Sequence, residues 1–209
     1  MFEELVKFFI VLLVVVEPLA LLPVLTGLTD GAEDSWRRHM SVKAVGISAI
    51  VCLVFAVGGM VLLDALGISV DAFKVGGGIL LFLLAVEMVF ARPSGVRSIT
   101  AGEDEEAHNR ADISVFPLSF PLIAGPGALA TILLAFAGVP LGSLQFFAQI
   151  GVIFLVLGIT LILMLASGPV MRVIGVTGGA VLSRLTGVLL AALAVQFVMD
   201  GIVGALAPS

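Results

Sequence analysis

The sequence contains one cysteine, one tryptophan and no tyrosine among its 209 residues, and only 12% of the residues are charged. The lone Cys52 excludes a disulfide framework and any CxxC pair for zinc or redox chemistry. No HExxH, GxSxG, Walker A or dinucleotide-binding pattern is present. His39 and His108 both fall in polar segments. We therefore expect no metal, no cofactor and no enzymatic activity.

Hydrophobic residues make up 60% of the chain, and the mean hydropathy is +1.26. Soluble domains carry roughly twice this share of charged residues. Apolar runs recur, and about 18 to 20 such residues suffice to cross a bilayer core of about 30 Å. The sequence thus predicts an integral membrane protein in a lipid bilayer, and its net charge of −5 gives no support for a nucleic-acid partner. The acidic Glu3 and Glu4 are unlike the basic start of a cleaved signal peptide.

Six apolar stretches separated by polar or short connections predict an all-α membrane protein with six transmembrane helices. The expected spans are residues 5–28, 43–63, 72–91, 114–138, 146–166 and 184–205. The expected connections are residues 29–42, 64–71, 92–113, 139–145 and 167–183. An even number of spans places both termini on one side of the membrane.

Lysine and arginine are distributed unevenly between the two sides. The side that holds the first, third and fifth connections carries eight of them: Arg37, Arg38, Lys43, Arg92, Arg97, Arg110, Arg172 and Arg184. The opposite side carries two, Lys7 and Lys74. Because cytoplasmic loops are enriched in basic residues, we expect these three connections in the cytoplasm and both termini in the periplasm.

The two halves of the sequence resemble each other. Residues 73–90 match residues 182–199 at seven of 18 positions, and Pro18 pairs with Pro126 at nearly the same offset. Three spans per half is an odd number, so the second half must be inserted upside down. Such inverted repeats are typical of secondary transporters with a midplane site. Chance similarity between apolar helices is the alternative.

The repeats divide one transmembrane domain, residues 1–209, into three parts. These parts are repeat 1, a cytoplasmic linker and repeat 2, over residues 1–91, 92–113 and 114–209.

The segment SVFPLSFPLIAGPGALATIL, residues 114–133, holds three prolines and two glycines inside an apolar span. Gly125 lies about 16 Å into the span at 1.5 Å per residue, and Glu17 and Pro18 lie similarly deep in the first span. Irregular backbone at this depth is tolerated only where protein or a watery cavity covers it. We expect helices 1 and 4 to be broken there and to meet near the midplane; two simple proline kinks are the alternative.

A helix that restarts at a proline leaves its first N–H groups without acceptors, and these groups form an anion site. The restarts are expected to free the amides of Gly127 and Ala128, at most also that of Leu129, and the amides of Leu19 and Ala20 in the first repeat. The predicted substrate-binding residues are Glu17, Pro18, Leu19, Ala20, Ala124, Gly125, Pro126, Gly127, Ala128 and Thr131. The Thr131 hydroxyl either faces the cavity or bonds the carbonyl four residues earlier.

Glu17 is the strongest candidate for coupling transport to an ion. A carboxylate in mid-membrane costs several kcal/mol unless it is protonated, paired or hydrated. It could cap the amides of the restarted helix, bind an ammonium group or bind a coupling cation; a buried, protonated structural glutamate is the alternative. Glu87 and its repeat partner Gln196 are weaker candidates for the pathway, because both lie near span ends.

The stretches VVVEPLALLPVL, FPLSFPLIAGPGALATIL and GGILLFLLAVEMV resemble the MarC family (UPF0056) of bacterial inner-membrane proteins. This resemblance implies six spans in two inverted repeats and a multi-pass protein of the cell inner membrane. The family includes SnatA-like transporters of small neutral amino acids, and its name comes from an antibiotic-resistance locus. Where the family usually has Asn or Asp, Pro, any residue and Gly, this chain has Glu17, Pro18, Leu19 and Ala20, which leaves less room.

The expected function is secondary transport of a small neutral amino acid such as alanine or glycine, driven by a proton or sodium gradient. The substrate carboxylate would lie on the amides of Gly127 and Ala128, and its ammonium group near Glu17. Two alternatives stay open: an exporter or channel for other small solutes, and a non-transporting membrane regulatory protein linked to antibiotic resistance. A homo-oligomer is compatible with the sequence but is not predicted by it.

Overall fold

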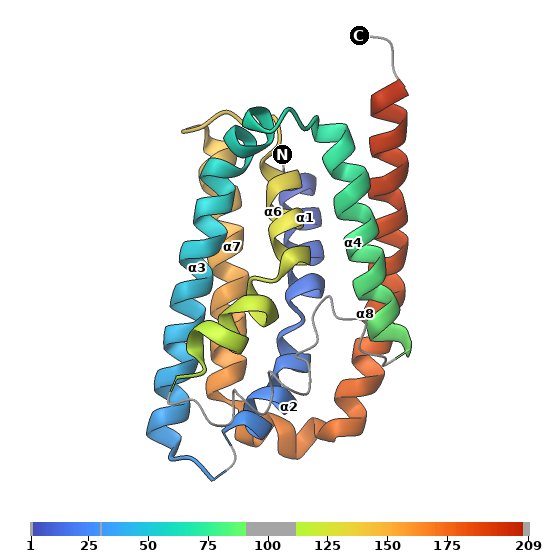
Figure 1. Cartoon of the computed structure of the whole chain (residues 1–209). Coiled ribbons are helices and arrows are strands. Elements are labelled where there is room, and N and C mark those ends of the chain that lie inside the picture. The colour runs from blue at the N-terminus through green and yellow to red at the C-terminus, as the bar shows by residue number, and fades with distance from the viewer. Residues whose placement is uncertain (1, 30, 91–111, 207–209) are drawn as a thin grey trace.

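The structure, a computed structural model, describes residues 2–29, 31–90 and 112–206, and these are helical apart from short connections. The helices are α1 (Phe2–Val16), α2 (Pro18–Leu28), α3 (Asp34–Ala65), α4 (Val70–Phe90), η1 (Ser114–Ile123), α6 (Pro126–Phe136), α7 (Leu144–Leu165) and α8 (Ser167–Leu206) (Figure 1). No strand occurs in these ranges. Most of the expected linker lies outside the described residues.

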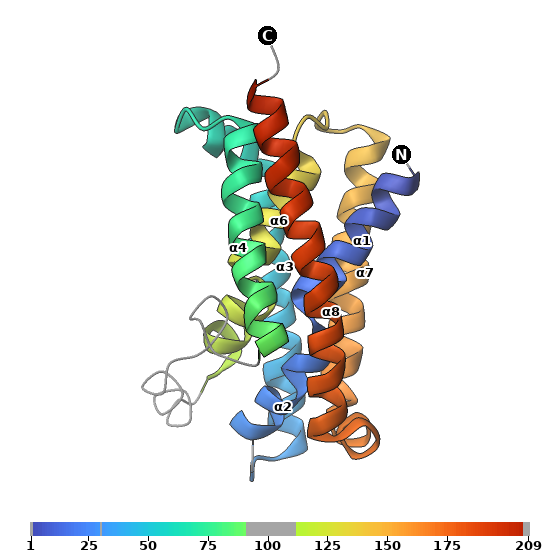
Figure 2. The same cartoon turned by 90° about the vertical axis from the view of Figure 1, so that its right-hand side faces the viewer.

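The described helices provide five stretches long and apolar enough to cross a membrane. They are Phe2–Leu28, Asp34–Ala65, Val70–Phe90, Leu144–Leu165 and Thr177–Leu206. The pair η1 and α6, bent by 56°, adds a sixth if it crosses as one span. An all-α membrane protein is thereby confirmed. The start of α1 and the end of α8 lie at the same end of the molecule (Figures 1 and 2).

The expected bounds of two connections are wrong, because one connection is partly helical and the other is helical throughout. Residues 29–42 include the first turns of α3, which begins at Asp34. Residues 167–183 belong to α8, and its beginning runs across the lower end of Figure 1 before the chain turns at Gly175, where φ is 64°. Hydropathy predicts the apolar part of a helix. It does not predict where the helix begins when the first turns are polar.

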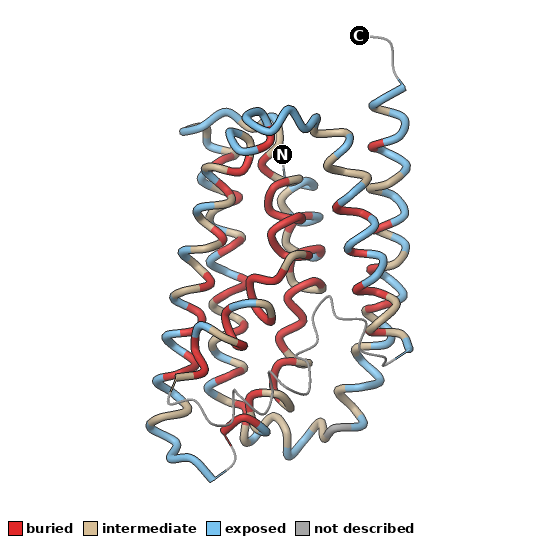
Figure 3. Tube along the Cα trace, in the orientation of Figure 1, coloured by how far each residue is buried: buried red, intermediate tan, exposed pale blue. Residues whose placement is uncertain are grey.

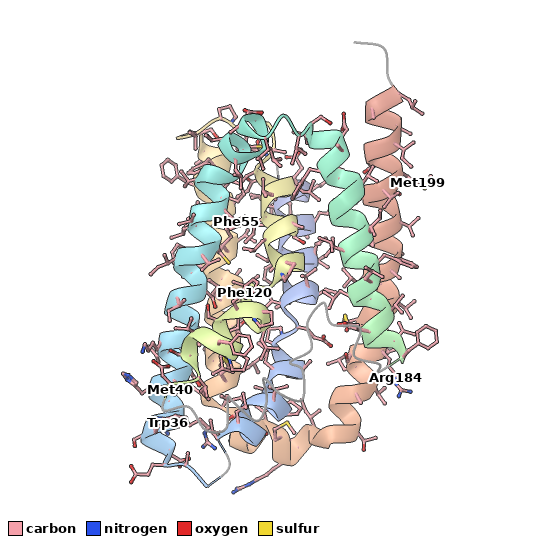
Figure 4. All side chains as sticks on the ribbon, in the orientation of Figure 1. Trp36, Met40, Phe55, Phe120, Arg184 and Met199 are labelled. Atoms are coloured by element: carbon pink, nitrogen blue, oxygen red, sulfur yellow. The ribbon has the colours of Figure 1, made fainter. Side chains whose placement is uncertain are left out.

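Burial separates inner from outer helices. Buried residues concentrate on α1, α2, η1 and α6, where every residue from Gly127 to Leu133 is buried (Figure 3). The longer helices α3, α4, α7 and α8 expose large apolar side chains outward. Met199, for example, is an exposed apolar side chain of α8 (Figure 4). An apolar outer surface of this kind suits a lipid environment.

Helices α4 and α8 run antiparallel, side by side (Figures 1 and 2). A Cβ added to Gly78 of α4 would lie 2.8 Å from Val198 Cγ2 of α8. Reciprocally, a Cβ added to Gly187 of α8 would lie 3.1 Å from Val89 Cγ2 of α4. Gly78 corresponds to Gly187 and Val89 to Val198 in the sequence alignment of the two halves. The two contacts are therefore equivalent, and both depend on the absence of a side chain.

Helix η1 is irregular and is fastened to α3. Phe116 and Phe120 have extended backbones, and each precedes a cis proline. Ser48 Oγ of α3 donates to Ser119 Oγ at 3.0 Å. At the start of η1, Asp112 accepts from the Ser114 N–H at 2.9 Å and forms an ion pair with Lys43 of α3. The hydrogen bond from Lys43, then those from Ser114, hold the pKa of Asp112 well below its ordinary value.

The α4–α8 contact predicts opposite effects for two neighbouring glycines. Gly78→Ala should lower the free energy of unfolding by about 1–3 kcal/mol, since its Cβ overlaps α8. Gly76→Ala is the control, because a Cβ there meets nothing within 4 Å, and it should be neutral or stabilising by up to about 1 kcal/mol. Thermal unfolding in detergent measures both; equal melting temperatures for the two variants would contradict the packing described.

Candidate functional site

The first helix break lies at Glu17. Its φ of 48° and ψ of 63° are left-handed, and α2 begins at Pro18. Its N–H donates to the Leu13 carbonyl at 2.9 Å, so α1 ends with a complete turn. The break is where the sequence predicts it. The expectation of a free Ala20 amide is wrong, since this N–H donates to the Glu17 carbonyl at 3.0 Å.

The side chain of Glu17 is 8% exposed and makes no capping hydrogen bond to α2. It lines a cavity of about 240 Å³, here named the break cavity, between the α1–α2 break and helices α7 and α8. Pro18 and Leu19 line the same cavity, while Ala20 is half-buried outside it. The walls are mostly apolar, and α8 contributes the hydroxyl of Ser183. The expected role of Glu17 as a cap for the amides of α2 is therefore not seen in the structure.

The second helix break lies at Gly125. Its ψ of 173° is extended, and α6 begins at Pro126. A Cβ on Gly125 would lie 2.2 Å from the Pro121 carbonyl oxygen, so only glycine fits. Ala124 is fully buried, and its N–H donates to the Ser119 carbonyl at 2.8 Å. This break too is where the sequence predicts it.

The restarted helix α6 leaves two amides without acceptors. The Leu129 N–H donates to the Gly125 carbonyl at 3.0 Å, so it is not free. For the N–H groups of Gly127 and Ala128, the described part of the chain provides no hydrogen-bond acceptor. Both residues are buried and both stand at the positive end of the helix dipole. The amides of Gly127 and Ala128 therefore lack acceptors among the described residues, as the sequence predicts, and the binding of an anion there stays a prediction.

The two breaks are neighbours, but they do not share a cavity. A Cβ on Gly127 would lie 3.1 Å from Val15 Cγ1, two residues before Glu17. The space beside Gly125, Gly127 and Ala128 is only about 10 Å³, roughly enough for one water. Glu17 lies on the separate break cavity. In this conformation the breaks touch through packed side chains rather than across an open chamber.

Of the two alternatives expected for Thr131, the structure shows the hydrogen bond to the carbonyl four residues earlier. Its hydroxyl donates to the Gly127 carbonyl at 2.9 Å. It also lines a third cavity, of about 270 Å³, with Lys7, Gln145 and Gln149. We name this the terminal cavity, because it lies among the parts of α1, α6, α7 and α8 nearest the end of the molecule where α1 starts.

Glu87 and Gln196 stand apart from the breaks. Glu87 is half-buried on α4, and Gln196 is exposed on α8, where its Nε2 donates to Asp200 Oδ1 at 2.6 Å. Neither lines the break cavity or the terminal cavity.

The sequence reasoning missed Gln149 and the cavity role of Lys7. Gln149 is 3% exposed in α7, with its Nε2 donating to the Ala135 carbonyl at 2.9 Å. An amide near the start of an apolar span is a signal that could have marked this position. Lys7 was counted only for membrane orientation.

Comparison with known proteins gives one consistent family. The model of the family described as "MarC family integral membrane protein" matches residues 2–206. The chain is 36% identical over 192 residues to the UPF0056 membrane protein MJ1677 of Methanocaldococcus jannaschii, covering 92% of each chain. It is 34% identical to YvbG of Bacillus subtilis, covering 98% of this chain and 96% of YvbG, and 34% identical to the UPF0056 inner membrane protein YhgN of Escherichia coli, covering 96% of each. No solved structure matches.

The second break predicts a sharp requirement for glycine. Gly125→Ala should lower the free energy of unfolding by about 3 kcal/mol or more, because the new Cβ overlaps a backbone oxygen. Gly27→Ala, in a helix position where a Cβ meets nothing within 4 Å, is the matched control. Melting temperature and monodispersity in detergent report the difference. Wild-type stability of Gly125→Ala would show that the break does not have this geometry.

Proposed function

This chain belongs to the MarC family of integral membrane proteins, and we propose that it is a secondary transporter of small neutral amino acids, such as alanine and glycine, driven by a proton or sodium gradient. It is a multi-pass membrane protein. Its relative YhgN of Escherichia coli bears the description "inner membrane protein", and we propose the same location for this chain, with both termini outside.

The observation that carries the proposal is the buried carboxylate of Glu17 at the interruption of a membrane span. The residue combines two unfavourable features, a left-handed backbone and burial of an ionisable group. Left-handed backbone costs roughly 1–2 kcal/mol for a residue with a Cβ, and burial of the charge within the bilayer costs several kcal/mol more. An apolar residue in helical conformation would avoid both the backbone cost and the cost of burying a charge. Reversible binding of a proton or cation is the function that needs a carboxylate here.

The amides of Gly127 and Ala128 supply the complementary part. They offer two buried donors to the carboxylate of an amino acid, while Glu17 offers a negative charge to its ammonium group. The contact between Val15 and Gly127 brings the two breaks within reach of one small solute. Because only about 10 Å³ is open beside Gly127, the solute enters when the breaks separate.

The reciprocal glycine contacts of α4 and α8 support two inverted repeats that rock against each other. Gly78 meets Val198 as Gly187 meets Val89, as a two-fold relation between the halves requires. The cavities fit alternating access as well. The terminal cavity is lined by α1 residues up to Val11 and lies toward the end where α1 starts. The break cavity is lined by α1 residues from Leu13 onward, so the two cavities lie one after the other along α1.

Glu17→Gln tests the proposal. Purified protein in liposomes should take up alanine or glycine when a proton or sodium gradient is imposed, and Glu17→Gln should reduce this uptake to that of empty liposomes. The variant keeps the size of the side chain but cannot release a proton or hold a cation. Glu3→Gln, at an exposed position of α1, is the control and should transport normally.

Three outcomes would reject the assignment. Absence of gradient-driven flux for every small amino acid would exclude this transport. Flux without saturation or counterflow would favour a channel. Unchanged uptake by Glu17→Gln would remove the carboxylate from the mechanism.

A further inference from the structure

The terminal cavity holds a concentration of polar groups that the breaks do not use. It is open to the end of the molecule where α1 starts, and its volume of about 270 Å³ falls just below the range of about 300–1,000 Å³ typical of drug-sized ligands. Its polar lining consists of Glu4, Lys7, Thr131, Gln145 and Gln149. Apolar side chains from the same helices complete the walls. A small, polar solute is the kind of ligand that fits.

Gln149 is buried with only half of its amide satisfied. Its NH₂ group is identified by its bond to the Ala135 carbonyl, because only the nitrogen can donate there. The carbonyl Oε1 is therefore the remaining atom, and within the described ranges of the chain it is buried and has no donor. Buried acceptors are rarely left without a partner. Gln149 lines the terminal cavity, so a rotation of its side chain would let a donor carried by a solute complete it.

Lys7 brings a positive charge to the same cavity. Its ammonium group lies 5.9 Å from the centroid of the Phe197 ring, and both residues line the cavity. Contact with an aromatic face favours a cation at this distance. Lys7 forms no ion pair with any described residue. Its charge can thus pair with an anionic group of a solute.

We propose that the terminal cavity is a recognition site for the zwitterionic backbone of an α-amino acid, separate from the site at the breaks. The carboxylate pairs with Lys7 Nζ, and the ammonium group donates to Gln149 Oε1. Phe8 and Val11 of α1 provide apolar surface for a small side chain. The class of solute rests on the proposed transport function, whereas the position rests on the cavity, the unpaired acceptor and the unpaired cation.

Equilibrium binding of radiolabelled L-alanine to the purified full chain in detergent tests the site. Gln149→Met should raise the Kd about tenfold, because a bond to a charged group is lost inside the protein. Lys7→Met should raise it about threefold, since exposed ion pairs are weak. The matched control is Lys74→Met. Lys74 pairs with Asp71 and does not line the cavity. This control should bind as the wild type does.

Two further measurements guard against misfolding and test the charge pattern. Propionate and ethylamine, which each keep one of the two charges of alanine, should compete at least about tenfold more weakly than alanine does, because each loses one charged contact. Gln149→Glu keeps the side-chain size and should bind ethylamine more tightly than the wild type. If Gln149→Glu is folded and shows no gain, the assigned role of Gln149 is wrong.

The results separate this site from the transport proposal. Glu17→Gln should lose uptake but keep alanine binding at the terminal cavity. Changed binding in the Lys7 and Gln149 variants, with no gradient-driven uptake by the wild type, would support the site and reject the transport function. Normal binding in both variants, or no alanine binding by the wild type, would overturn the site. If uptake continued in either case, the transport proposal would stand.

Discussion

The structure depends on one constraint: backbone groups within hydrocarbon must find their partners inside the protein. Two apolar segments are interrupted, at Glu17 and at Gly125, and both interruptions lie in the most enclosed part of the molecule. The long helices α3, α4, α7 and α8 surround them and face outward with apolar side chains. The outer helices thus shield the interrupted backbone from lipid, as a helical bundle with broken helices requires.

Covering the breaks leaves little space beside the second break and more space beside the first break and toward the end where α1 starts. Small residues allow the close approach: Gly125 packs on the Pro121 carbonyl and Gly127 on Val15. The result is about 10 Å³ at the second break, against about 240 Å³ beside Glu17 and about 270 Å³ toward the end where α1 starts. A solute that crosses this protein must therefore move packed backbone, which ties passage to a change of conformation rather than to an open pore.

The breaks could be predicted from sequence because their signals are local. Proline removes a donor and glycine tolerates close contact, so Gly125 and Pro126 mark a helix restart wherever they stand. The left-handed conformation of Glu17 could not be predicted, because glutamate seldom adopts it alone and only the surrounding helices hold it there. The start of α8 could not be predicted from hydropathy, because residues 167–174 form a helix but not an apolar span.

The candidate site could be predicted only in part, since cavities arise from contacts distant in sequence. Gly127 and Ala128 were found from their position after Pro126, and they do lack acceptors among the described residues. That Glu17 would line a different cavity depends on how α7 and α8 pack against α1, which no local pattern records. The same holds for Lys7 and Gln149, which are 142 positions apart in the chain and line one cavity.

The identity of residue 17 follows from these contacts. Asparagine or aspartate, which the family resemblance implies at this position, adopts left-handed backbone more readily and is a good N-cap for the helix that follows. Glutamate has the less favourable backbone, and Glu17 makes no capping bond to α2. Its longer side chain lines the break cavity beside α7 and α8 instead. In this chain, local stability of the break is thus exchanged for a carboxylate on the cavity wall, which is the group that the proposed ion coupling requires.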